Sequence, residues 1–151
     1  MNIPKERYKE ILELMPICCI DVVIIYKGKI FMVKRTNEPA KNQWWFPGGR
    51  VLKNEKLRDA VKRKLFEETG LRGKSIKPLI FDETIFEKSS IKGINAHTIN
   101  LCFSIEVDND QVVLDNQSSE YKWVDKIEEK WHPYVKKVIE YSGIFKQNKK
   151  E

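Results

Sequence analysis

Runs of apolar residues with two different spacings divide this chain into predicted helices and predicted strands. Some segments carry apolar residues at helical spacing, whereas β-branched or alternating apolar runs in others are typical of strands. The predicted helices are residues 4–14, the segment between Asn54 and Gly70, and residues 128–141. The predicted strands are residues 17–26, 29–35, 76–85, 97–107 and 119–124. This order predicts one domain over residues 1–151, an α/β/α sandwich with a mixed β-sheet and helices on both faces.

The segments between these elements are predicted to be turns and loops. Residues 27–29 suit a hairpin turn, and residues 36–50 are expected to form a loop. At least one of the aromatic residues 44–46 is expected to pack in the core, and a ring that faces a nucleobase is the alternative. The basic tail from about residue 146 is expected to be flexible.

The composition indicates a globular protein with an excess of positive charge. The chain has 151 residues, is 41% hydrophobic and 33% charged, and carries a net charge of +6. This balance excludes a disordered or fibrous protein, and the length is sufficient to bury a core. The positive charge indicates either solubility or attraction of an anionic substrate, and nucleic acid is a less favoured class of partner. Much of the excess lies in the tail after Lys146, so the charge is discounted as evidence for a binding groove.

The cysteines and the N-terminal residues indicate a compartment. Cys18, Cys19 and Cys102 lie in apolar runs without metal-ligand spacing, which predicts buried free thiols in a reducing environment. The N-terminal segment carries several charges and no long apolar run, so neither a signal peptide nor a membrane span is expected. We therefore predict a cytoplasmic protein that does not bind membranes.

The stretch of residues 48–71 contains the side chains best suited to chemistry. It opens with two glycines, Asn54 is expected to cap the helix that follows, and Gly70 is placed to end that helix in a left-handed conformation. Glu67 and Glu68 lie at the end of the helix. Carboxylates there, beside backbone carbonyls, suit a hard cation such as Mg²⁺ that keeps positions for water and substrate phosphates. A solvated acidic surface is the alternative interpretation.

This spacing resembles the Nudix box, whose pattern is G-x5-E-x7-R-E-U-x-E-E-x-G-U with U an aliphatic residue. The matching residues are Gly49, Glu55, Arg63, Leu65, Glu67, Glu68, Gly70 and Leu71. The acid that follows the arginine in the pattern is replaced by Lys64. The resemblance implies a Nudix hydrolase with the α/β/α sandwich of that family, in which Arg63 pairs with Glu55 and holds the loop.

A narrower resemblance is to the GDP-mannose mannosyl hydrolases. It is carried by the segment VKRTNEPAKNQWWFPGGRVLKNEKL, with Asp21 upstream and NQSSEYKW downstream, and it covers the first half of the chain better than the second. In that subfamily one arginine lies in a KRTN-x-PA loop, as Arg35 does, and another follows the glycine pair, as Arg50 does. The acid at the position of Lys64 is also missing there. Its members break the sugar C–O bond by water attack at the anomeric carbon, whereas most Nudix enzymes attack phosphorus.

The resemblance implies a metal site that binds Mg²⁺, with Mn²⁺ as an alternative. Its expected ligands are Glu68, Glu67, a backbone carbonyl of Gly48 or Gly49, and Gln117. The ammonium of Lys64, on the same side of the helix as the two acids, would compete with a cation or replace one. Attack at carbon needs the metal only to neutralise the leaving diphosphate, so fewer carboxylates suffice.

The substrate is expected to meet three further residues. Arg35 and Arg50 would bind the diphosphate and stabilise the charge that grows on it in the reaction, for which surface solvation is the alternative. Asp21 interrupts an apolar strand and either lines the substrate pocket or turns to solvent at a strand end. The resemblance also implies a homodimer, since the mannosyl hydrolases tend to dimerise.

The general base is not supplied by the resemblance. The mannosyl hydrolases carry a histidine directly after the glutamine that corresponds to Gln117, where this chain has Ser118, and a serine hydroxyl is a poor base. Glu120, on the same side of the strand, and Glu67 are the favoured replacements. A Glu67 that activates water on the metal would favour attack at phosphorus. His97 is a third, for which a packed histidine is the favoured interpretation.

These observations predict a Mg²⁺-dependent hydrolase of a nucleoside-diphosphate derivative, with a nucleotide sugar such as GDP-mannose as the first substrate to test. The presence of both box acids leaves a MutT-like pyrophosphohydrolase of nucleoside triphosphates or dinucleotides as an alternative. The loss of the usual base leaves a weakly active Nudix domain that binds nucleotides or RNA as another.

Overall fold

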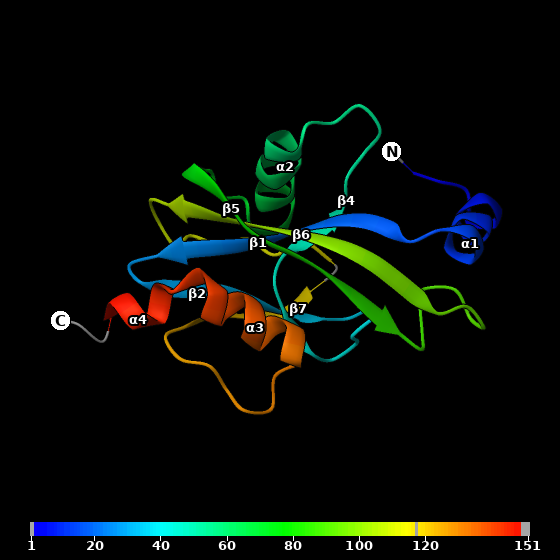
Figure 1. Ribbon diagram of the computed structural model, residues 1–151. Helices are drawn as coiled ribbons and strands as arrows, with labels where there is room; N and C mark the ends of the chain where they lie inside the picture. The colour runs from blue at the N-terminus through cyan, green and yellow to red at the C-terminus, as the bar shows by residue number, and fades with distance from the viewer. Residues whose placement is uncertain (1, 117, 149–151) are drawn as a thin grey trace.

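The computed structural model describes residues 2–116 and 118–148 and contains a mixed sheet between helices (Figure 1). The helices are α1 (Lys5–Leu14), α2 (Leu57–Thr69), α3 (Pro133–Ser142) and α4 (Ile144–Asn148). The strands are β1 (Ile17–Tyr26), β2 (Lys29–Arg35), β3 (Trp44–Trp45), β4 (Gly48–Arg50), β5 (Gly73–Phe86), β6 (Ala96–Val107) and β7 (Ser118–Val124). These elements confirm the predicted fold class.

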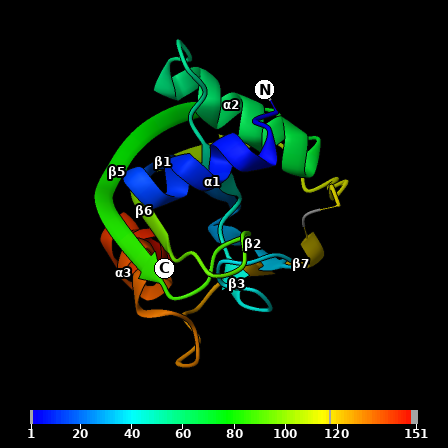
Figure 2. The ribbon, with the colours of Figure 1, turned by 90° about the vertical axis from the view of Figure 1, so that its right-hand side faces the viewer.

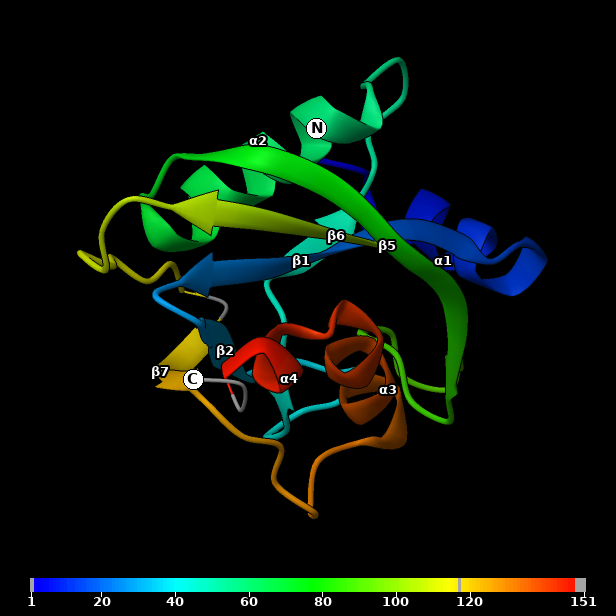
Figure 3. The same cartoon turned by 60° about the vertical axis from the view of Figure 1, so that its left-hand side comes forward.

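Seven strands in the described residues form one sheet, with β1 at its centre. The order is β3-β2-β1-β6-β5, while β4 pairs with β1 and β7 pairs with β2. β1 and β6 run parallel, and the other pairs are antiparallel. β5 is long and strongly curved, and it passes from the face that carries α2 towards α3 (Figures 2 and 3). The sheet is therefore mixed, as the order of the predicted elements requires.

Helices cover both faces of the sheet, α2 on one face and α3 with α4 on the other, and each face has its own core (Figures 1 and 3). The α2 face buries apolar side chains of the helix and of alternate strand positions: Ile20, Val22, Ile24, Ala60, Val61, Leu65 and Ile105. The α3 face buries a second set: Val23, Ile30, Met32, Trp45, Val135, Val138 and Ile139. Because successive strand residues point to opposite faces and both faces are covered, β1 reads as a nearly continuous apolar run.

Residues 36–50 differ from the loop that the sequence predicts, because two short strands lie within it. Trp44 and Trp45 pair with β2, and β4 pairs with β1 with Gly48 opposite Asp21. Trp45 and Phe46 are buried, which confirms that aromatic residues of this segment pack in the core. The pairing of β4 with β1 brings the glycine pair against the charged position of the central strand.

The helix boundaries correct two predictions and confirm one. α2 begins after Lys56, whose side chain makes no capping hydrogen bond, and Asn54 lies outside the helix with φ of 67°, so the predicted cap is wrong. Gly70 ends α2 with φ of 73°, as predicted. α3 begins at Pro133, so the predicted start at residue 128 is wrong. A proline suits the first helical position, and Nδ1 of His132 accepts the backbone N–H of Tyr134.

The first part of the basic tail is helical. α4 includes residues 146–148 of the tail that is predicted to be flexible, and its Phe145 packs against the α3 core. Residues 149–151 lie outside the described residues.

The three cysteines differ in exposure. All are free; Cys102 is buried, Cys19 is half-buried and Cys18 is exposed. The prediction of a buried thiol is therefore wrong for Cys18, because the start of β1 extends beyond α2 (Figure 1). None of the helices in the described part of the chain has the length and apolar character that a membrane span requires.

Candidate active site

A cavity of about 430 Å³ opens where the glycine pair, the last turns of α2 and the starting end of β6 come together. Among its walls are these predicted site residues: Asp21, Arg35, Gly48, Gly49, Arg50, Arg63 and Glu67. Lys64 also lines the cavity, whereas Glu68 and Glu120 are not among the residues that line it. The structure therefore brings together most of the predicted substrate and metal residues, which come from β1, β2, β4 and α2.

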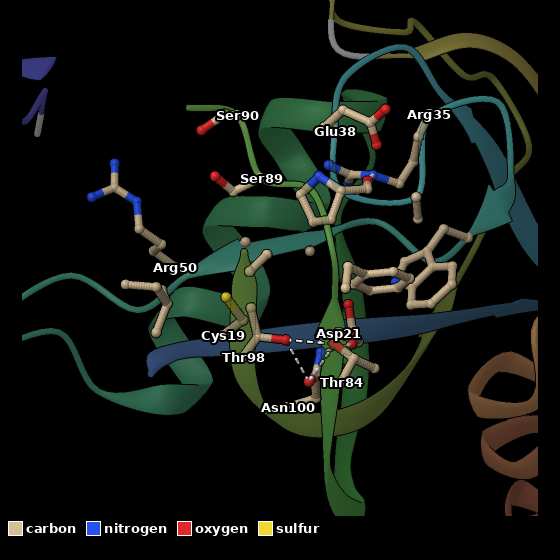
Figure 4. A pocket seen from close by; sticks show the side chains of 18 of the residues that line it. Cys19, Asp21, Arg35, Glu38, Arg50, Thr84, Ser89, Ser90, Thr98 and Asn100 are labelled. Atoms are coloured by element: carbon tan, nitrogen blue, oxygen red, sulfur yellow. Dashed lines mark hydrogen bonds between the residues drawn. The ribbon is translucent and has the colours of Figure 1, made fainter. Parts of the chain in front are cut away.

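The base of the cavity is a buried hydrogen-bonded group around Asp21 (Figure 4). Asp21 is 4% exposed, which excludes the solvent-facing alternative. The amide of Asn100 donates to Asp21 Oδ2 at 2.9 Å, and the hydroxyl of Tyr134 donates to the same oxygen. Burial raises the pKa of Asp21, while the two donated hydrogen bonds oppose that shift. Thr98 donates to Asn100 Oδ1 at 2.8 Å and extends the group along β6.

Asn100 and Tyr134 are functional candidates that the sequence interpretation missed. Asn100 interrupts an apolar strand as Asp21 does, and that shared signal was available in the sequence. Tyr134 carried no such signal, because it lies among the apolar residues of a helix whose ring positions are typical of core packing.

Two arginines line the cavity and are held by different contacts (Figure 4). Nε of Arg35 donates to the backbone carbonyl of Pro39 at 2.8 Å, which fixes the direction of the side chain. The guanidinium of Arg50 lies 5.1 Å from the centre of the Tyr8 ring, a cation–π contact with α1. Both cations therefore lie where an anionic ligand in the cavity can meet them.

The end of α2 is tied to the glycine pair through a buried acid. Glu68 is 4% exposed, and its Oε2 accepts the backbone N–H of Gly48 at 2.8 Å. Burial raises the pKa of Glu68 to about 7, the ammonium of Lys64 opposes that shift, and the charge of Asp115 adds to it. Glu67 is different, because 48% of its side chain is exposed and it pairs with Arg63 and Lys64.

Glu55 and Arg63 form the ion pair that the motif implies. Nε of Arg63 lies 2.6 Å from Oε2 of Glu55, and a terminal nitrogen of Arg63 donates to Oε1 at 2.9 Å. The same terminal nitrogen donates to the carbonyl of Arg50 at 3.0 Å. The hydrogen bonds from Arg63 lower the pKa of Glu55. This pair connects α2 with the loop before it and with β4.

Comparison with known proteins gives the family. The model of the NUDIX domain family matches residues 19–141. The chain belongs to the Nudix family. This Nudix domain is also similar to two curated proteins. It is 33% identical to the low-salt glycan biosynthesis protein Agl8 of Haloferax volcanii, over 92% of this chain and 90% of that protein. It is 31% identical to an ADP-ribose pyrophosphatase of Methanocaldococcus jannaschii, over 76% and 64% respectively.

A solved structure supports the same fold. The MutT NUDIX hydrolase from Burkholderia pseudomallei superposes with a TM-score of 0.69 at 21% identity, over 84% of this chain and 98% of that one. Family and fold together identify this chain as a Nudix hydrolase.

The end of α2 fits a cation that the substrate helps to bind. Glu67 and Glu68 are adjacent there, and the backbone of the glycine pair is in contact with Glu68. Within the described residues, no group of three or more histidine, cysteine, aspartate and glutamate side chains is arranged to hold a metal ion. Mg²⁺ needs no such cage, since one or two carboxylates with water and substrate phosphates suffice. The predicted ligand Gln117 lies outside the described residues.

The three candidate bases lie in different surroundings. Glu67 lines the cavity. Glu120 is exposed on β7, and its Oε1 lies 3.6 Å from the Nζ of Lys34. His97 borders the cavity but alternates with Thr98 along β6, so its ring projects to the opposite face, where Nε2 lies 2.8 Å from Oε2 of Glu83. The packed interpretation of His97 does not hold, because the ring is partly exposed and paired with an acid.

Proposed function

We propose that this Nudix hydrolase cleaves a nucleoside-diphosphate sugar with the help of Mg²⁺, and that GDP-mannose is the first substrate to test. The observation that carries the proposal is that Arg35, Arg50 and Asp21 line one cavity with the acid Glu67. Such a cavity offers cations to a diphosphate and a buried carboxylate to hydroxyl or N–H groups of the sugar or base.

Each group has a role in this reaction. Arg35 and Arg50 bind the diphosphate and stabilise the negative charge that collects on it as the anomeric C–O bond breaks. Water attacks the anomeric carbon, the electron pair of the broken bond leaves with the nucleoside diphosphate, and Glu67 accepts the proton of the water. A divalent ion held by Glu68 and Glu67 would neutralise further charge on the leaving group.

The relatives support a sugar nucleotide as the substrate class. The Haloferax protein is named for glycan biosynthesis, and glycans are assembled from activated sugars. We extend the proposal to a homodimer, which size-exclusion chromatography with light scattering tests, and to a cytoplasmic location, which cell fractionation tests.

Attack at phosphorus is the second candidate. It is favoured by the presence of two adjacent acids at the end of α2, of which Glu68 is held by the N–H of Gly48. It is also favoured by the similarity to an ADP-ribose pyrophosphatase. In that reaction the water would add to a phosphorus atom of a dinucleotide or triphosphate, and the products would be two phosphorylated compounds.

The test is hydrolysis in ¹⁸O-labelled water with Mg²⁺ and a panel of nucleotide sugars, ADP-ribose and triphosphates, with the products read by mass spectrometry. Label in the free sugar supports the proposal, and label in a phosphate supports the second candidate. Arg35→Gln and Arg50→Gln should each raise KM or lower kcat, whereas the exposed Arg72→Gln serves as the control. Nucleotide binding without any product would instead assign the protein to a binding class.

A further inference from the structure

Lys64 is a buried cation at the place where the Nudix pattern has an acid. It is 6% exposed, and lysine is rarely buried without a carboxylate partner. Its Nζ lies 3.4 Å from Oε2 of Glu67. Its neighbours along one side of α2 are therefore the two acids of the box, one turn further along the helix.

The side chain of Lys64 also fills the space beside the glycine pair. A Cβ added to Gly49 would lie 3.1 Å from Cε and 3.4 Å from Nζ of Lys64, so the end of the lysine packs on the backbone of Gly49. The adjacent Gly48 donates its N–H to Glu68. The ammonium thus lies among the glycine backbone, Glu67 and Glu68, the same groups that would hold a divalent ion.

We propose that the Lys64 ammonium is a resident cation that takes the place of a second divalent ion and restricts the site to one. Glu67 already faces two cations, Arg63 at 3.2 Å and Lys64 at 3.4 Å, so little negative charge is left at this end of α2 for a second ion. A substrate diphosphate can balance one Mg²⁺ added to such a site, whereas a second ion would meet the ammonium in its position. This inference assumes that a first divalent ion binds, and that ion is part of the proposed function.

The experiment is a titration with Mn²⁺ in the presence of GDP, in which the free ion is measured by electron paramagnetic resonance. The wild type is expected to bind one Mn²⁺ per chain. Lys64→Glu is expected to bind two, because it replaces the cation by a ligand. Lys64→Met keeps the shape without the charge and is expected to bind one ion about tenfold more tightly. Lys62→Glu, an exposed position of the same helix, should match the wild type.

The outcomes separate this inference from the proposed function. Two ions or none in the wild type, or unchanged binding in Lys64→Met, overturns the role of Lys64. If thermal melting shows that Lys64→Glu does not fold, the affinity of Lys64→Met for Mn²⁺ still tests the role of Lys64. Hydrolysis of the nucleotide sugars is measured on the same samples, so one ion without turnover rejects the proposed reaction and leaves the resident cation in place.

Discussion

Gly48 donates its backbone N–H to Oε2 of Glu68 at 2.8 Å, although twenty positions separate the two residues. The bond joins β4 to the end of α2 and directs a buried carboxylate at the glycine backbone. Position 48 requires glycine for a steric reason. A Cβ there would lie 2.3 Å from the carbonyl oxygen of Ile20 and 2.7 Å from Oδ1 of Asp21. The glycine pair thus permits β4 to approach the charged position of β1.

Gly48→Ala is expected to destabilise the fold by about 1–3 kcal/mol, since β4 must move away from β1 to admit the methyl group. Urea denaturation measures the loss. Gly93→Ala is the control, because nothing lies within 4 Å of its Cβ position and only its φ of 85° opposes the change. Equal losses in the two variants would show that β4 has room for a side chain.

Glu68→Gln is expected to lower turnover of the substrate found by the labelling experiment by about 10²-fold, because it removes a charge from the proposed metal site. The folded state should not lose stability at pH 8. The amide oxygen can still accept from Gly48, and the buried carboxylate, whose pKa is raised to about 7, no longer has to be ionised. Thermal melting and steady-state kinetics measure the two effects, with Glu106→Gln, at an exposed position of β6, as the control.

The Glu55–Arg63 pair predicts a pH dependence of stability. Its hydrogen bonds lower the pKa of Glu55 in the folded state, so its contribution is fully present above the ordinary pKa of glutamate, 4.5. It is lost as the pH falls through the lowered pKa of the folded protein. Glu55→Gln should therefore cost about 1–3 kcal/mol at pH 7, and the difference from the wild type should shrink only below pH 4.5.

Denaturation midpoints over a pH series measure this effect. Glu13→Gln, at an exposed position of α1, is the control variant. A Glu55→Gln difference that stays constant down to the acid transition would mean that packing, and not the charge, accounts for the pair.

The periodicity of the sequence was sufficient to predict the long strands and the helices α2 and α3, because these elements bury apolar side chains in the core. The strand over residues 17–26 and the helix that ends at Gly70 follow from local patterns. The strands β3 and β4 do not, because two or three residues carry no measurable period and are strands only through their partners β2 and β1.

In the candidate site, too, local patterns predict some residues and miss those that depend on distant partners. The box residues are fixed in spacing along one helix, so the sequence was informative about them. The partners of Asp21 are Asn100 and Tyr134, which lie 79 and 113 positions away. Only the packing of β6 and α3 against β1 brings them together, and no local signal reports such a contact.

The hydrogen bond from Tyr134 to Asp21 predicts a measurable coupling. Tyr134→Phe should destabilise the protein by about 1–2 kcal/mol, because a buried carboxylate loses one of its two donors. A double-mutant cycle with Asp21→Asn should give a coupling energy of about 0.5–3 kcal/mol. Tyr141→Phe, at an exposed position, should leave the stability unchanged. Additive effects of Tyr134→Phe and Asp21→Asn would show that the two side chains act independently.

Tyr8 is expected to position Arg50 for the substrate. The ring of Tyr8 lies under the guanidinium of Arg50 and both residues line the cavity, while α1 buries none of its residues. Tyr8→Ala should therefore raise KM for the nucleotide substrate about two- to fivefold and leave kcat nearly unchanged, because the lost cation–π contact is worth about 0.5–1 kcal/mol. Tyr8→Phe keeps the ring and should restore the wild-type KM. Leu14→Ala, at an exposed position of α1, controls for damage to the helix. A raised KM in Tyr8→Phe as well would assign the effect to the hydroxyl and not to the ring.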